Sequence, residues 1–390
     1  MLGRIAMTAI VTDAHYRMSV SLIRDLFDRG VRVAACEKAS IEAPVGFASR
    51  GAAQCVRLPD EEYEAALLAL CREVLEIEGE KPVLLPVGAK TLAMVSRSHD
   101  AFSAVAGLCA ATSSQLALFN DKAAVSALAK TLGVPVPESF ERQPEEADEP
   151  FFSRVPLPCA VKPHCGESFG LTASQRYRIC RTKNELIAAF RHFQTLTNED
   201  PIVQEYLPGT AFGCSVLAKD GAVYRSLCHR RVREYPVSGG PSSCCESVSR
   251  EDLLAFSEAL VRKTGFTGPA MFEFKCAADG SPRLLEVNPR VWGTFPLTRA
   301  AKTDFAYSWF CLAANLPLPE EVPAQHVKMA YYPADFAAGL GYLKAGQPGR
   351  FFAAAADFLN PRVKNGIADP KDPAPARVYF RNLFHRGGHK

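Results

Sequence analysis

The sequence has no long apolar run and no strong excess of charge of either sign. No stretch of about 18 apolar residues is present, so no membrane-spanning helix is expected. The apolar run in residues 1–13 is too short for a signal peptide and ends at Asp13, which favours a buried first strand and a cytoplasmic location. The net charge of +3 neither favours nor excludes nucleic acid, and we expect none as a partner.

Thirteen cysteines are present, but no CxxC pair is. An odd number of cysteines without an export signal favours reduced thiols. Cys228 and His229 are adjacent, as are Cys244 and Cys245, and this spacing is poor for zinc. We therefore interpret the cysteines as small buried residues rather than metal ligands.

The first part of the chain follows a strand–helix–strand pattern. Residues 4–12 predict a strand, residues 19–29 a helix that stops at Gly30, and residues 31–37 a second strand. Such a unit is typical of a parallel, doubly wound sheet. The turn after the first strand lacks GxGxxG, so we expect no dinucleotide site there. With 390 residues, the chain is expected to form roughly two to four domains.

The segment 270–290 predicts two strands joined by a tight turn at Asp279-Gly280. A two-residue turn would set Glu273 opposite Glu286, with Asn288 on the same face as Glu286 and Arg290 following it. Phe272, Phe274, Leu285 and Val287 would then face a core. Facing carboxylates repel each other, and oxygen ligands suit Mg²⁺, so the pattern indicates a site for Mg²⁺ and phosphate. The alternative is an exposed hairpin with solvated acids.

Two further segments favour nucleotide binding. Lys162 ends a predicted strand before a glycine-bracketed loop, 166–170, whose backbone could approach a phosphate, although an ordinary loop is the alternative. Residues 204–209, QEYLPG, present an extended backbone that could read an adenine edge. Upstream, Asn120 is expected to cap a helix that starts DKAAV.

This order of motifs resembles the ATP-grasp superfamily of ATP-dependent carboxylate–amine ligases. The resemblance covers about residues 80–300 and is closest to carbamoyl-phosphate synthase-like ATP-grasp domains. The matching motifs are FNDK, AVKP, IVQEYLPG and FEFK…LLEVNPRVWG. The resemblance implies an α/β and α+β multidomain protein, with a doubly wound pre-ATP-grasp domain followed by a two-lobed ATP-grasp fold. The domains implied are 1–115, the Rossmann-like domain; 116–200, the small lobe; 201–320, the large lobe; and 321–390, a C-terminal extension.

The resemblance also implies roles for individual residues. ATP and Mg²⁺, or Mn²⁺, would be the cofactors, and 166–170 would cover the γ-phosphate. The implied nucleotide-binding residues are Lys122, Lys162, Gly166, Ser168, Gly170, Glu205, Tyr206 and Leu207; the metal ligands Glu273, Glu286 and Asn288; the substrate residues Arg231, Arg233, Ser238, Gly239 and Gly240; and the catalytic residues Arg290 and Lys162.

Two residues depart from the superfamily pattern. The position at which many relatives carry a ribose-binding acid is Phe212, and the phosphate loop contains an acid, Glu167. Alternation along a strand places Arg231 and Arg233 on one face with His229.

The expected reaction joins a small-molecule carboxylate to an amine through an acyl phosphate, with release of ADP. Because no nucleophile has an adjacent base other than Cys165 beside His164, we expect positioning and charge neutralisation rather than covalent catalysis. Two alternatives are an ATP-dependent carboxylation through carboxyphosphate and ATP binding without turnover. The basic tail, 377–390, indicates a docked or frayed helix, or contact with a membrane surface. A homodimer is possible on general grounds.

Overall fold

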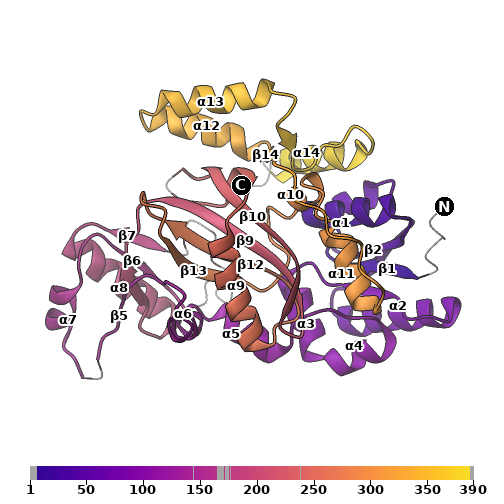
Figure 1. Cartoon of the computed structure of the whole chain (residues 1–390), viewed down its shortest axis with the longest axis horizontal. Coiled ribbons are helices and arrows are strands. Elements are labelled where there is room, and N and C mark those ends of the chain that lie inside the picture. The colour runs from indigo at the N-terminus through magenta and orange to yellow at the C-terminus, as the bar shows by residue number, and fades with distance from the viewer. Residues whose placement is uncertain are drawn as a thin grey trace.

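The structure is a computed structural model that describes residues 7–143, 145–164, 171, 175, 177–237 and 239–386, with the backbone alone for 384–386. Within these residues the strands form three sheets (Figure 1). A parallel sheet lies near the N-terminus, a small antiparallel sheet lies at the opposite end of the molecule, and the largest sheet lies between them.

The N-terminal sheet is parallel, with strand order β3-β2-β1-β4. Alternate strand residues face opposite sides, so α1 packs with Val11 on one face and α2 packs with Ile10 on the other. Covered faces on both sides confirm the doubly wound part of the predicted fold class. The elements are β1 (Thr8–Val11), α1 (Arg17–Asp28), β2 (Arg32–Lys38), η1 (Val45–Ala48), β3 (Gln54–Leu58), α2 (Tyr63–Glu78), β4 (Val83–Leu85), α3 (Ala89–Arg97), α4 (His99–Val105) and α5 (Ser113–Asn120).

The helix α6 (Lys122–Thr131) starts one residue later than expected. Asn120 ends α5, and Asp121 is the capping residue, because its carboxylate accepts hydrogen bonds from the backbone N–H groups of Ala123 (2.8 Å) and Ala124 (3.0 Å). The cap makes Lys122 the first residue of the helix.

The small sheet is antiparallel, in the order β5-β8-β6-β7. Helices α7 and α8 cover it with a cluster of phenylalanines that includes Phe151, Phe190 and Phe193. This packing fixes β6, which ends at Lys162. The elements are β5 (Ser139–Phe140), α7 (Asp148–Arg154), β6 (Cys159–Lys162), β7 (Arg178–Cys180), α8 (Lys183–Thr197) and β8 (Ile202–Glu205).

The large sheet has the order β13-β12-β9-β10-β11-β14-β15, antiparallel except for the last pair. One face packs on α9 and α5 in a cluster that contains Phe272 of β12 and Phe266, which follows α9. Other residues of the sheet, such as Leu217, pack with Trp309 of α11. The elements are β9 (Thr210–Lys219), β10 (Ala222–Glu234), β11 (Ser242–Val248), α9 (Glu251–Thr264), β12 (Gly268–Cys276), β13 (Pro282–Asn288), α10 (Pro296–Ala300), α11 (Phe305–Ala314), β14 (Lys328–Ala330) and β15 (Lys364–Asn365).

The β12–β13 hairpin differs from the expected tight turn. The loop is one residue longer: Gly280 donates to the Ala277 carbonyl with φ +85°, and Cys276 pairs with Pro282. The register then shifts between Glu273 and Phe274, which makes Leu285 a bulge residue. Leu284 therefore occupies the core in place of Leu285, and the Glu273–Glu286 pairing is confirmed.

After β14 the chain forms a helical hairpin, α12 (Ala334–Lys344) and α13 (Pro348–Leu359), and then α14 (Ala374–Arg386). Asp372 anchors this end on the N-terminal region, because its carboxylate accepts hydrogen bonds from Arg24 (2.9 Å) and Ser49 (2.7 Å). Among the described residues, no helix combines the length and the apolar character needed to cross a membrane.

Candidate active site

A cavity of about 470 Å³ lies between the small sheet and the large sheet. Twelve of the predicted site residues line it, from α6, β6, the segment after β8, β10, β12 and β13. These are Lys122, Lys162, Glu205, Tyr206, Leu207, Arg231, Gly239, Gly240, Glu273, Glu286, Asn288 and Arg290. The cavity therefore contains every described residue predicted for the site except Arg233. Gly166, Ser168, Gly170 and Ser238, together with Cys165 and Glu167, lie outside the described residues.

The two facing carboxylates are each neutralised by a cation. Lys122 Nζ lies 3.1 Å from Glu286 Oε2, and the guanidinium of Arg231 donates to Glu273. Asn288 donates from Nδ2 to Glu273 Oε1 at 3.1 Å, which joins the amide to the same cluster. In the part of the chain that is described, no three His, Cys, Asp or Glu side chains form a metal cluster, so the available oxygen donors are two carboxylates and an amide.

The charges around the acids separate their pKa values. Burial alone would raise the pKa of Glu286, but Lys122 and Lys162 outweigh it and lower that pKa to about 2. Burial raises the pKa of Glu273, and the charge of Glu286 raises it further, against the opposite effect of Arg231. At neutral pH the cluster therefore keeps Glu286 as a carboxylate.

Lys162 is buried at the end of β6, and the charge of Glu286 offsets only part of the cost of burying its ammonium group. Its Nζ donates to the Leu285 carbonyl at 3.5 Å, a contact that the bulge at Leu285 makes available. Burial, and then the charge of Lys122, lower the pKa of Lys162 to about 8. A buried ammonium group in this position favours an anionic ligand.

Arg290 follows β13 at the edge of the cavity. It donates to the Val291 carbonyl at 3.1 Å and to Asn288 Oδ1 at 3.4 Å. The guanidinium therefore lies beside the carboxylate cluster, and Trp292 and Gly293 continue the cavity wall.

The chain at the end of β8 lines the cavity with its backbone. The backbone N–H of Glu205 donates to the Glu138 carbonyl (2.9 Å), and that of Tyr206 donates to the Pro158 carbonyl (3.2 Å). The Glu205 carboxylate accepts from the Glu138 N–H at 3.1 Å. Within the described residues, the backbone of Leu207 makes no hydrogen bond, so Leu207 can pair with a planar ligand edge.

Arg231 and Arg233 do not share a face, contrary to the sequence prediction. Arg231 pairs with Cys245 and Arg233 with Cys244, so the strand carries an extra residue at Val232 and the two arginines diverge. Arg233 is buried away from the cavity and bonds Asp335 (2.8 Å) and Asp357 (2.7 Å). Its predicted place in the substrate pocket is therefore wrong.

The position predicted for a ribose-binding acid, Phe212, does not line the cavity. Phe212 packs with the core of α9 and lies under the guanidinium of Arg250 at 5.0 Å. Its neighbours Ala211 and, across the ladder, Lys275 line the cavity instead.

Several lining residues were not predicted. Strand alternation from Glu273 was sufficient to place Lys275 on the same face, but Tyr177 needed the fold. His229 does not line the cavity itself. His229 is buried with Nε2 3.2 Å from Thr294 Oγ1, and burial, then Arg231, lower its pKa to about 3. Its ring lies over Gly213, the residue between His229 and Glu273 in the sheet, where a Cβ would come within 2.2 Å of the ring.

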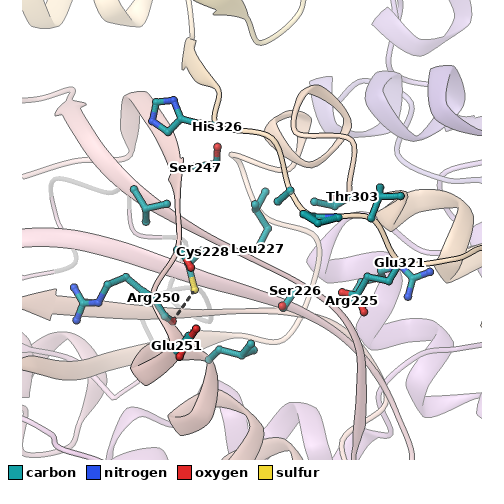
Figure 2. Close-up of a pocket in the computed structure, with 16 residues that line it drawn as sticks. Arg225, Ser226, Leu227, Cys228, Ser247, Arg250, Glu251, Thr303, Glu321 and His326 are labelled. Atoms are coloured by element: carbon teal, nitrogen blue, oxygen red, sulfur yellow. Dashed lines mark hydrogen bonds between the residues drawn. The ribbon is translucent and has the colours of Figure 1, made fainter.

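A larger cavity, about 620 Å³, lies between β10, β11, α9 and segment 321–326 (Figure 2). Two of its arginines already have partners: Arg225 donates to the Tyr224 carbonyl at 2.7 Å, and Arg250 pairs with Asp252 at 2.6 Å. Cys228 donates to the Arg250 carbonyl at 3.6 Å (Figure 2). Because none of the described residues predicted for the site lines this cavity, we place the candidate active site in the smaller one.

The sheets and the cavity between them define an ATP-grasp fold, and comparisons with known proteins agree. Residues 197–332 match a family described as ATP-grasp in the biosynthetic pathway with Ter operon. No curated protein matches the sequence. The predicted resemblance to the ATP-grasp superfamily is thereby confirmed.

Solved structures of ATP-grasp enzymes cover most of the chain. One is the biotin carboxylase domain dimer of Hydrogenobacter thermophilus 2-oxoglutarate carboxylase, solved with MgADP, ADP and bicarbonate. Its sequence is 16% identical and its TM-score is 0.64, and the match covers 82% of this chain and 73% of that one. An L-amino acid ligase from Bacillus licheniformis is 16% identical with a TM-score of 0.58, covering 83% and 78%. The ADP complex of an N5-carboxyaminoimidazole ribonucleotide synthetase is 13% identical with a TM-score of 0.61, covering 87% and 84%. The chain has the fold of ATP-dependent ligases and carboxylases.

Proposed function

We propose that the protein is an ATP-dependent ligase that joins a small-molecule carboxylate to an amine through an acyl phosphate. The observation that carries the proposal is the pair of facing carboxylates, Glu273 and Glu286, each balanced by a cation inside one cavity. When a nucleoside triphosphate and a divalent cation bind together, the cation can take the place of the lysine and arginine beside the carboxylates, and the phosphates can take the place of the carboxylates beside the lysine and arginine.

The nucleotide would lie along the cavity from Leu207 to Lys162. The open backbone of Leu207 suits the adenine edge, and the buried ammonium of Lys162 suits the phosphates. Lys122 now neutralises Glu286, and it can turn toward a phosphate when a divalent cation takes its place beside that carboxylate. This arrangement supports ATP as the phosphoryl donor.

The oxygen donors fit Mg²⁺ or Mn²⁺. Glu273, Glu286 and the amide oxygen of Asn288 would hold the ion, since hard cations prefer carboxylate and amide oxygens. When bound, the ion would offset the negative charge of the phosphates during transfer.

The reaction would proceed in two balanced steps. A carboxylate oxygen of the substrate attacks the γ-phosphorus, the bond to the bridging oxygen breaks, and ADP leaves. An amine nitrogen then attacks the acyl carbon, inorganic phosphate leaves, and the nitrogen releases a proton to form the amide. Arg290 would hold the transferred phosphoryl group, and Arg231 with Gly239 and Gly240 would hold the substrate carboxylate.

A carboxylation through carboxyphosphate is the second candidate. It is supported by the similarity to a biotin carboxylase domain solved with bicarbonate and to an N5-carboxyaminoimidazole ribonucleotide synthetase. In that reaction bicarbonate takes the place of the substrate carboxylate in the first step.

The test is ADP release with Mg²⁺, measured with amino acids singly and in pairs and with bicarbonate alone. A ligase releases ADP only when a carboxylate and an amine are both present. Bicarbonate-dependent ADP release without an amine would favour the carboxylase, and tight ATP binding with no ADP across the panel would favour a non-catalytic protein.

A further inference from the structure

The outer face of α13 carries an apolar stripe without a partner among the described residues. Phe352 is 67% exposed and Leu359 is 79% exposed, and Ala355 and Ala356 between them are also exposed. The spacing i, i+3, i+4, i+7 places all four on one side of the helix. Such a stripe normally packs against another element.

The opposite side of α13 is the one that the fold uses. Ala354 is buried against Gly339 of α12, where a Cβ would lie 3.4 Å from the Ala354 Cβ. Asp357 accepts from Arg233 at 2.7 Å and from Lys328 at 2.6 Å. These contacts turn the stripe away from the body, and α13 lies at the outer edge of the molecule (Figure 1).

Helix α12 extends the apolar surface. Phe336, Leu340 and Leu343 are 46%, 55% and 45% exposed, at the spacing i, i+4, i+7. With Phe352, Phe358 and Leu359 they offer on the order of 600 Å² of apolar side-chain surface. A standard protein interface buries about 800 Å² on each partner, so the hairpin supplies most of one.

Charge is nearly absent from this surface. Between residues 333 and 360 the exposed charged side chains are Lys344 and Arg350, both near the loop that joins the helices, while Asp335 and Asp357 are paired with Arg233. Depletion of charge is typical of the centre of a homodimer interface. A helix that lies on a membrane carries cations along its polar face instead.

The stripe is also self-complementary. Its order is large, small, small, large, so reversing the helix exchanges Phe352 with Leu359 and Ala355 with Ala356. An antiparallel pair of such helices places the bulky residues of one copy against the bulky residues of the other, with the alanines at the crossing. A two-fold axis requires this reciprocity, in which residue i meets j and j meets i.

We propose that α13 forms a symmetric homodimer contact with α13 of a second copy, crossing at Ala355 and Ala356, with α12 at the sides. The inference is independent of the reaction proposed for the cavity, because no residue of the stripe lines it.

Sedimentation velocity on the full chain tests the proposal. The wild type sediments as a dimer at micromolar concentration, and Ala356→Glu weakens the dimer dissociation constant at least about 30-fold, the loss expected for a central interface position. Ile77→Glu, at a residue 73% exposed on α2, is the matched control and leaves the dimer intact. Unchanged far-ultraviolet circular dichroism of both variants shows that the fold is retained.

A cross-linking experiment gives a second readout. In a Cys55→Ser background, Ala356→Cys forms an intermolecular disulfide under mild oxidation, and Ile77→Cys does not. Three results would overturn the proposal. The wild type could remain a monomer even at 100 times the micromolar concentration, or Ala356→Glu could leave the dimer unchanged. The third result is a monomeric wild type that binds anionic phospholipid vesicles and loses this binding in Ala356→Glu.

Discussion

Glu273 and Glu286 lie directly opposite each other in the β12–β13 ladder, although the loop that joins the strands is one residue longer than a tight turn. The bulge at Leu285 absorbs the extra residue and at the same time turns the Leu285 carbonyl toward Lys162. Facing acids destabilise a ladder unless cations offset their charge, and here Lys122 and Arg231 lie beside the two carboxylates.

The first prediction concerns Glu286. Replacing it with glutamine removes the charge but keeps the size, so Mg²⁺-dependent ADP formation falls by about 10²–10³. Asp279→Asn, at the tip of the same hairpin, is the matched control and keeps wild-type activity. Wild-type turnover by Glu286→Gln at limiting Mg²⁺ would show that this carboxylate holds no metal.

The second prediction is a pH dependence of nucleotide binding. The pKa of Lys162 is lowered to about 8, so its ammonium loses a proton as the pH rises through that value. Bound phosphates favour the charged form, and ADP affinity therefore falls above pH 8, approaching about tenfold per pH unit. Calorimetric titration of ADP from pH 6.5 to 9.5 measures this. Lys162→Arg, which stays protonated, gives a flat profile, and equal slopes for the two proteins would contradict the assignment.

The third prediction separates two neighbouring arginines. Arg233→Ala leaves the buried carboxylate of Asp335 without its cation, so the free energy of unfolding falls by about 3–5 kcal/mol. Arg230→Ala breaks only a surface pair with Glu246 and costs within about 1 kcal/mol. Urea denaturation compares them, and equal stability of the two variants would show that Arg233 is no anchor for α12 and α13.

The fourth prediction concerns the glycine beneath His229. A methyl group at Gly213 would meet the imidazole ring, so Gly213→Ala destabilises the protein by about 1–3 kcal/mol. In a His229→Ala background the ring is gone and the penalty shrinks, which a double-mutant cycle measures. Additive effects of the two substitutions would contradict the contact.

Strand alternation and turn residues were enough to predict the parts of the fold that depend on local pattern. They predicted the hairpin, and the spacing of apolar residues predicted α1 and the doubly wound sheet. The predicted Glu273–Glu286 pair is present because the bulge at Leu285 offsets the extra residue of the loop, which the turn residues did not predict. The errors arose where one extra residue enters a strand: Leu285 left the core and Arg233 left the cavity, because a bulge reverses the faces that follow it. No short-range pattern marks a bulge, since the partner strand determines it. Likewise, the contact of His229 with Thr294 joins residues far apart in the chain.

In the proposed reaction, a substrate carboxylate attacks the γ-phosphate of ATP in this cavity. Isotope transfer tests it most directly: carboxylates labelled with ¹⁸O are supplied with amines, ATP and Mg²⁺, and the released phosphate is analysed by mass spectrometry. An acyl phosphate predicts ADP and one ¹⁸O in each phosphate released. Amide formation with unlabelled phosphate, or with AMP and pyrophosphate as products, would contradict the account.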